Sequence, residues 1–131
     1  MVALVVVAAC GPGRAAFDRH SLGELKHAFA RGGLEVCSTL AHADGLANQA
    51  VSSEVMLVGI DCHEQAVSLI VDRFANPDDR DSAARNFEVL VRPRGDGVVW
   101  TWGRFTIFAV AGRDAAVMRR ITKTLDRIGA A

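Results

Sequence analysis

The sequence lacks any apolar run long enough to cross a bilayer. Its longest uncharged apolar stretch, residues 2–9, is far shorter than the ~20 residues that a spanning helix needs. It also lacks an excess of either charge, because 15 basic residues balance 15 acidic ones, so nucleic acid is a poor partner. Three cysteines in 131 residues do not make a dense disulfide framework. A chain of this length buries enough surface to fold as one domain without such a framework.

Hydrophobic periodicity predicts three helices and four or five strands after residue 20. The first helix follows Ser21, which forms a capping box with Glu24, and Asn76 and Asp114 are the expected caps of the other two. The last apolar run is one long strand or two strands joined at Gly103. Strands in succession between helices favour an α+β domain, with helices packed on one face of a mostly antiparallel sheet of four or five strands. The predicted strands cover residues 34–41, 54–62, 66–74 and 98–110.

The opening run of the chain has the composition of a secretion signal. Residues 2–9 supply eight apolar positions, the last of them small, and Cys10 follows directly. This stretch resembles the bacterial lipobox, in which a cysteine after an aliphatic and two small residues becomes lipidated. On this interpretation residues 1–9 are the remnant of a signal peptide, residues 10–20 are a tether, and residues 21–131 form a single α+β domain.

The other two cysteines, Cys37 and Cys62, lie on neighbouring predicted strands. If Cys10 carries lipid, they remain as an even pair, and an exported chain meets an oxidising environment in which they can form a bridge. The alternative is that all three are buried, reduced thiols, since free cysteine is among the most buried residue types. Strand parity does not settle the pairing, because Cys37 falls on the less apolar face of its strand while both faces of the second strand are apolar.

Over nearly its whole length the chain resembles the short secreted lipoproteins of actinobacteria. After the lipobox, the resemblance is carried by the segments "LKHAFARGGLEVC", "VGIDC", "VVWTWGRFTIFAVAG" and "RDAAVMRRITKTLDRIG". The resemblance implies export, membrane anchoring through Cys10 and a bridge between Cys37 and Cys62. It implies no known activity, because most such proteins have no assigned function.

A second interpretation of the opening run is a strand followed by a phosphate-binding loop in a cytoplasmic α/β nucleotide-binding or enzymatic domain. The motif G-x-G-x-x-A is satisfied, and Gly11, Gly13 and Arg14 would form the loop. Two features weigh against it: the predicted helix starts beyond the motif, at Ser21, and the chain lacks the alternating β-α-β pattern of a doubly wound sheet. A third interpretation is a cytoplasmic interaction domain that dimerises through its sheet.

Trp100 and Trp102 lie two residues apart and therefore on one face of their strand. An exposed pair would form a ligand face able to stack on the sugar rings of a cell envelope, whereas a buried pair would belong to the core. The segment 61–64 brings together a thiol, an imidazole and two carboxylates. Adjacent residues of a strand point to opposite faces, however, so Cys62 and His63 are badly placed as a nucleophile and its base.

Among the four histidines only His42 has a ligand-like neighbour, Asp44, and no second cluster completes a zinc site. We therefore predict no metal, no cofactor and no catalytic residue. The leading hypothesis is an exported lipoprotein held on the outer face of the cytoplasmic membrane by Cys10. It would act as a non-enzymatic binding or accessory domain for an envelope protein or a small ligand.

Overall fold

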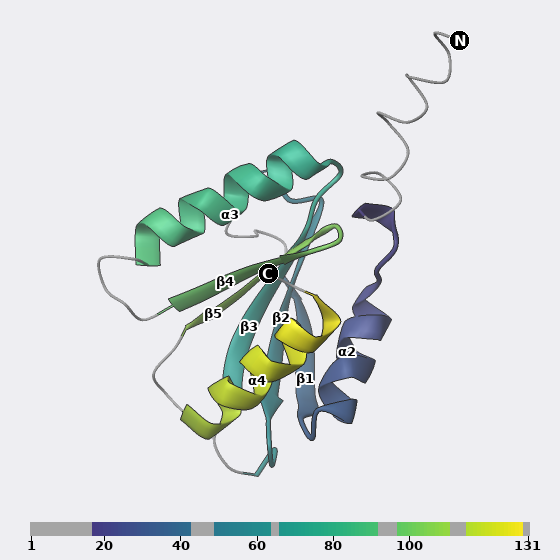
Figure 1. The fold of residues 1–131 in the computed structure, drawn as a ribbon, viewed down its shortest axis with the longest axis vertical. Helices are drawn as coiled ribbons and strands as arrows, with labels where there is room; N and C mark the ends of the chain where they lie inside the picture. The colour runs from purple at the N-terminus through teal and green to yellow at the C-terminus, as the bar shows by residue number, and fades with distance from the viewer. Residues whose placement is uncertain (1–16, 43–48, 64–65, 92–96, 111–114, 130–131) are drawn as a thin grey trace, which may run out of the picture.

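The computed structural model describes residues 17–42, 49–63, 66–91, 97–110 and 115–129. Its elements follow one another in the order α-β-β-β-α-β-β-α, and the last apolar run is two strands joined at Gly103 (Figure 1). The helices are α2 (Leu22–Arg31), α3 (Pro77–Val91) and α4 (Ala115–Ile128), and the strands are β1 (Glu35–His42), β2 (Ser52–Gly59), β3 (Ala66–Arg73), β4 (Gly97–Trp102) and β5 (Phe105–Val110).

The five strands form one sheet in the order β1-β2-β3-β5-β4, and every neighbouring pair is antiparallel. The first three strands follow one another along the chain. Helix α3 then leads from β3 to β4, and β5 returns between these two strands. The edges of the sheet are therefore β1 and β4. The predicted α+β fold, with a mostly antiparallel sheet of four or five strands, is confirmed.

The two faces of the sheet are covered by different helices. On the central strand β3, Leu69 and Val71 point into the larger core, which α2 and α4 close. The residue between them, Ile70, packs instead against a second core that contains Phe87 of α3 and Phe108 of β5. The prediction that the helices pack on one face is therefore wrong, because both faces of the central strands are apolar and α3 lies on the opposite side from α2 and α4 (Figure 1).

The helix starts follow from side chains that satisfy free backbone N–H groups. The hydroxyl of Ser21 accepts a hydrogen bond from the backbone N–H of Glu24 at 3.3 Å, as predicted. At the start of α3 the carboxamide oxygen of Asn76 accepts from the backbone N–H of Asp79 at 2.9 Å, also as predicted. The expected cap of α4, Asp114, lies outside the described residues.

The residues just before Ser21, where the domain was predicted to begin, also pack against the fold. Phe17 is only 3% exposed, and the ring of His20 stacks on Trp102 with the ring centroids 4.2 Å apart. The tether expected over residues 10–20 stays a prediction, and the last four of these residues lie against the fold. A cap marks where a helix starts, but it does not show whether the chain before the helix also packs against the fold.

Helix α3 leaves part of its own face of the sheet uncovered. Leu40, on the edge strand β1, is 67% exposed. Two further apolar side chains of the same face, Val51 just before β2 and Leu57 within it, are 54% and 36% exposed. This open patch continues an apolar row that crosses all five strands and becomes buried near α3. The row consists of Leu40, Val55, Ile70, Phe108 and Val99.

The contrast between buried and exposed leucines gives a direct test of this fold. Replacing the fully buried Leu69 by alanine removes three carbon atoms from the larger core, and we expect the free energy of unfolding to fall by about 3 kcal/mol. The same change at the exposed Leu40 should cost less than about 0.5 kcal/mol. Urea unfolding followed by circular dichroism measures both values, and equal losses would contradict the two-sided arrangement described above.

Candidate functional site

The sulfur atoms of Cys37 and Cys62 lie 2.09 Å apart, at disulfide bonding distance, and their Cα atoms are 5.5 Å apart. Cys37 lies at a β-bulge, because the register between β1 and β2 shifts between Val36 and Ser38 and leaves Cys37 without a partner residue. Cys62 follows the end of β2 in a turn. The bulge explains why strand parity could not settle this pairing: Cys37 stands outside the regular alternation of its strand.

The turn that holds Cys62 is not a catalytic arrangement in this structure. With its sulfur joined to Cys37, Cys62 has no thiolate to act as a nucleophile. The backbone N–H of His63 donates to Oδ1 of Asp61 at 2.9 Å, so the carboxylate closes the turn. His63 itself is exposed. Glu64 lies outside the described residues.

We expect this bridge to stabilise the fold substantially, since it closes a loop with a sequence separation of 25 residues. The chain-entropy model gives about 3.5 kcal/mol for a loop of this length. The double variant Cys37→Ser/Cys62→Ser should therefore unfold at a lower urea concentration, with that loss of free energy. Cys10→Ser is the matched control and should leave the urea midpoint unchanged. Identical midpoints for the parent chain and the double variant would show that the two sulfur atoms are not bridged.

Trp100 and Trp102 do not form a ligand face. Each is 5% exposed, and both belong to the larger core beneath α2 and α4. They do share one face of β4, as their spacing predicted, but the helices cover that face. Among the described residues the indole N–H of Trp102 finds no hydrogen-bond partner, and the ring of His20 stacks on it instead. The ligand-face hypothesis is therefore wrong for this pair.

The segment before α2 docks on the turn between β4 and β5. The Phe17 ring lies between two guanidinium groups, 5.5 Å from that of Arg80 and 5.2 Å from that of Arg104. Asp18 forms an ion pair with Arg104. Nδ1 of His20 donates to Oε2 of Glu24 at 3.0 Å, which fixes the ring that stacks on Trp102. Residues 17–20 thus pack against this turn.

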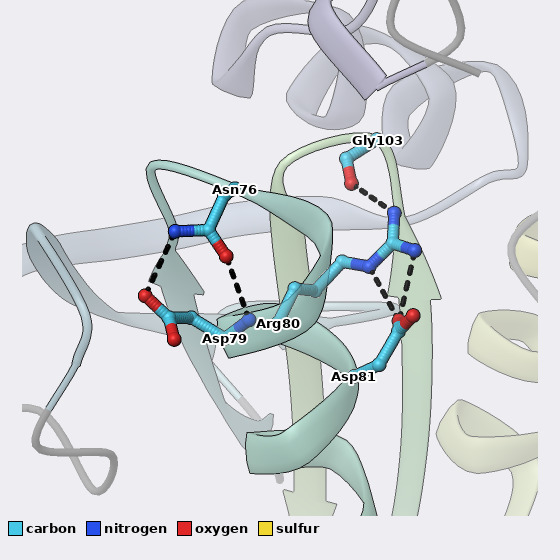
Figure 2. Close-up of polar contacts among 5 residues, drawn as sticks. All are labelled: Asn76, Asp79, Arg80, Asp81 and Gly103. Atoms are coloured by element: carbon cyan, nitrogen blue, oxygen red, sulfur yellow. Dashed lines mark hydrogen bonds and ion pairs between the residues drawn. The ribbon is translucent and has the colours of Figure 1, made fainter. Parts of the chain in front are cut away.

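The first turn of α3 completes the same polar cluster, as Figure 2 shows. Arg80 donates from one terminal nitrogen to the backbone oxygen of Gly103 at 2.6 Å, and its Nε donates to Oδ1 of Asp81 at 2.9 Å. Asn76 and Asp79 bond to each other through both side-chain and backbone groups. Arg80 therefore ties the start of α3 to the β4–β5 turn, and the cluster joins three elements that are distant in the sequence.

Gly103 was predicted only as a strand junction, and the contacts of its neighbours were not predicted. The backbone of Gly103 has φ +54°, which favours glycine, and a Cβ at this position would lie 3.1 Å from the Cβ of His20. The glycine therefore serves both the tight turn and the close approach of the N-terminal segment. An aromatic residue shortly before the cap, Phe17, was the one available signal that this segment packs on the fold.

Phe17 should hold the segment in place through burial of its ring. Phe17→Ala removes about 2 kcal/mol of apolar burial, so the docked segment should open about thirtyfold more often. Tryptic cleavage after Arg19 measures this opening in the folded protein. Asp18→Ala removes only a partly exposed ion pair and should change the rate by less than about fivefold. Equal cleavage rates in the parent chain and in Phe17→Ala would contradict the docking.

A groove of about 590 Å³ opens between α4 and the edge strand β4. The half-buried Val98 and the buried Met118 contribute its apolar surface. Exposed charged side chains from successive turns of α4 form its rim, and they carry both signs of charge. This groove is a concave surface formed by described residues, and it is our candidate binding site. Its lining residues are Val98, Met118, Arg119, Thr122, Lys123 and Asp126.

Several predicted site residues lie outside the described residues: the lipidation residue Cys10 and the phosphate-loop residues Gly11, Gly13 and Arg14. Within the described part of the chain, no three histidine, cysteine or acidic side chains gather closely enough to hold a metal ion. None of the helices in that part combines the length and hydrophobicity needed to cross a membrane. Dimerisation through the sheet stays a prediction, and the open patch at Leu40 is the surface on which it would depend.

Comparison with known proteins gives no match: no family model, no curated protein and no solved structure is similar to this chain. The resemblance to secreted lipoproteins of actinobacteria accordingly stays a prediction. Function has to be inferred from the cysteine pair, the docked N-terminal segment and the groove.

Proposed function

We propose that this protein is exported and anchored to the outer face of the cytoplasmic membrane by a lipid on Cys10. There it acts as a non-enzymatic binding or accessory domain of the cell envelope. One observation carries the proposal: Cys37 and Cys62 lie at bonding distance, which leaves Cys10 as the odd cysteine. Disulfides persist in oxidising compartments outside the cytoplasm, and the odd cysteine is the one that stands in the lipobox-like segment.

The docked N-terminal segment supports this proposal by giving the anchor a defined exit. Phe17 and Asp18 fix the chain at the β4–β5 turn, beside Arg104. Phe17 is seven positions after Cys10, and seven residue steps span at most about 25 Å. A lipid on Cys10 would therefore hold the domain close to the membrane surface, with the β4–β5 turn toward the lipid.

A binding role is supported by the groove between α4 and β4. Ligand sites in proteins are concave and mostly apolar, with a few charged or polar groups that orient the ligand. The groove combines Val98 and Met118 with exposed charges such as Lys123. The polar clusters of the described residues, in contrast, make contacts within the fold. Arg80 and Arg104 hold the N-terminal segment and the β4–β5 turn.

Intact-mass measurement on protein from membranes of the native host tests the proposal. We expect loss of the residues that precede Cys10, an added diacylglycerol on its sulfur, and no free thiol at Cys37 or Cys62 after alkylation. Cys10→Ser should abolish the lipid and release the protein from the membrane fraction.

The double variant Cys37→Ser/Cys62→Ser is the matched control, because it changes two cysteines but should keep the lipid. An unprocessed chain with three free thiols would refute the proposal. A processed, lipidated chain with both thiols free would leave the anchor intact and refute the bridge that supports it.

A further inference from the structure

The edge strand β4 and the helix α4 together form a surface that fits an extended peptide. Strand β4 ends the sheet, so its outer main-chain N–H and C=O groups have no neighbouring strand in the described sheet. Helix α4 lies over the sheet face that carries Val98, and the groove opens between this helix and Val98 of the edge strand. A sheet edge flanked by a helix is the arrangement in which an added strand gains both main-chain hydrogen bonds and side-chain contacts.

The charges on α4 favour an acidic partner. Its exposed face carries Arg119, Arg120, Lys123 and Arg127 against the single acid Asp126. Arg120 donates to the backbone oxygen of Gly33 at 3.1 Å and so is turned toward α2. Arg119 and Lys123 remain on the groove, one helical turn apart.

These two cations lie beside an apolar surface, in a groove whose lining also includes Asp126. Met118 lies next to Arg119 on the helix, and Val98 lies across the groove on β4. An extended chain presents every second side chain to one face, about 6.8 Å apart. An apolar side chain placed over Val98 and Met118 therefore carries its second neighbours within reach of the long side chains of Arg119 and Lys123.

The groove lies away from the exit of the N-terminal segment. Val98 is near the beginning of β4, whereas the segment docks at Gly103, beyond its end. Five residues of strand separate the two positions, or about 17 Å. A protein bound in the groove therefore does not compete with the chain that leads to Cys10.

We propose that the groove between β4 and α4 binds an extended acidic peptide segment of a partner protein as a sixth strand. The segment has an apolar side chain over Val98 and Met118 and acidic side chains two residues to either side, facing Arg119 and Lys123. This inference rests on the proposed binding function and names its partner. It does not depend on the lipid, so the purified, unlipidated full chain can test it.

The probe is the fluorescein-labelled peptide STETVTETS, whose valine and two glutamates share one face when it is extended. Fluorescence anisotropy against the full chain should give saturable binding that weakens at high salt. STKTVTKTS reverses the two charges and STETSTETS removes the apolar side chain, and both should bind at least about tenfold more weakly. Two further versions of the peptide are N-methylated at alternate residues, one at the odd and one at the even positions. Only the version whose methyl groups block main-chain pairing with β4 should lose binding.

Charge reversal on the protein provides the complementary test. The Lys123→Glu variant should bind STETVTETS about tenfold more weakly than the parent chain does, and it should bind STKTVTKTS instead. Arg85→Glu is the matched control: it changes the net charge equally, but Arg85 is exposed on α3, on the opposite face of the sheet, and binding should be unchanged.

Three results would overturn the proposal. The first is no saturable binding of STETVTETS. The second is equal weakening by Lys123→Glu and Arg85→Glu, which would indicate a general charge effect. The third is a dimer of the chain that Lys123→Glu abolishes in sedimentation, which would assign the groove to a second copy. In each case the lipid on Cys10 can still be found by mass, so failure here is distinct from failure of the anchor.

Discussion

The structure depends on a sheet whose central strands are apolar on both faces. Strand β3 sends Leu69 and Val71 to one side and Ile70 to the other, so burial requires helices on both sides. Two helices, α2 and α4, close the larger core, and only α3 serves the second. Coverage is therefore complete on one face and partial on the other, which leaves Leu40 exposed on β1.

The N-terminal segment docks on the same sheet, at the turn between β4 and β5. The Phe17 ring fills the space between Arg80 and Arg104, and His20 covers the indole of Trp102. Arg80 belongs to α3 and Arg104 belongs to the β4–β5 turn. The N-terminal segment therefore links the helix that covers one face of the sheet to the turn between β4 and β5. A change in Gly103 would disturb both contacts, since the close approach of His20 leaves little space for a side chain.

Much of this fold could be predicted from the sequence, because apolar periodicity and caps are local signals. Ser21 and Asn76 cap the helices that they were predicted to cap, and the antiparallel α+β class follows from the order of elements. Three features could not be predicted, because each depends on contacts between distant residues. The bulge at Cys37 moves that side chain out of strand parity, Phe17 packs near two arginines that are distant in the sequence, and the groove forms between α4 and Val98 of β4.

The relative positions of the turn and the groove connect structure to the proposed role. A membrane-held domain can bind a partner only if its binding surface remains accessible while the anchor is engaged. The segment that begins at Phe17 docks at the Gly103 end of β4, and the groove lies toward the Gly97 end, so the two surfaces lie at opposite ends of one strand. Because β4 is also an edge strand, its outer main-chain groups extend from the groove toward the turn at Gly103. A partner segment added there would run along the strand that links the groove to the point of attachment.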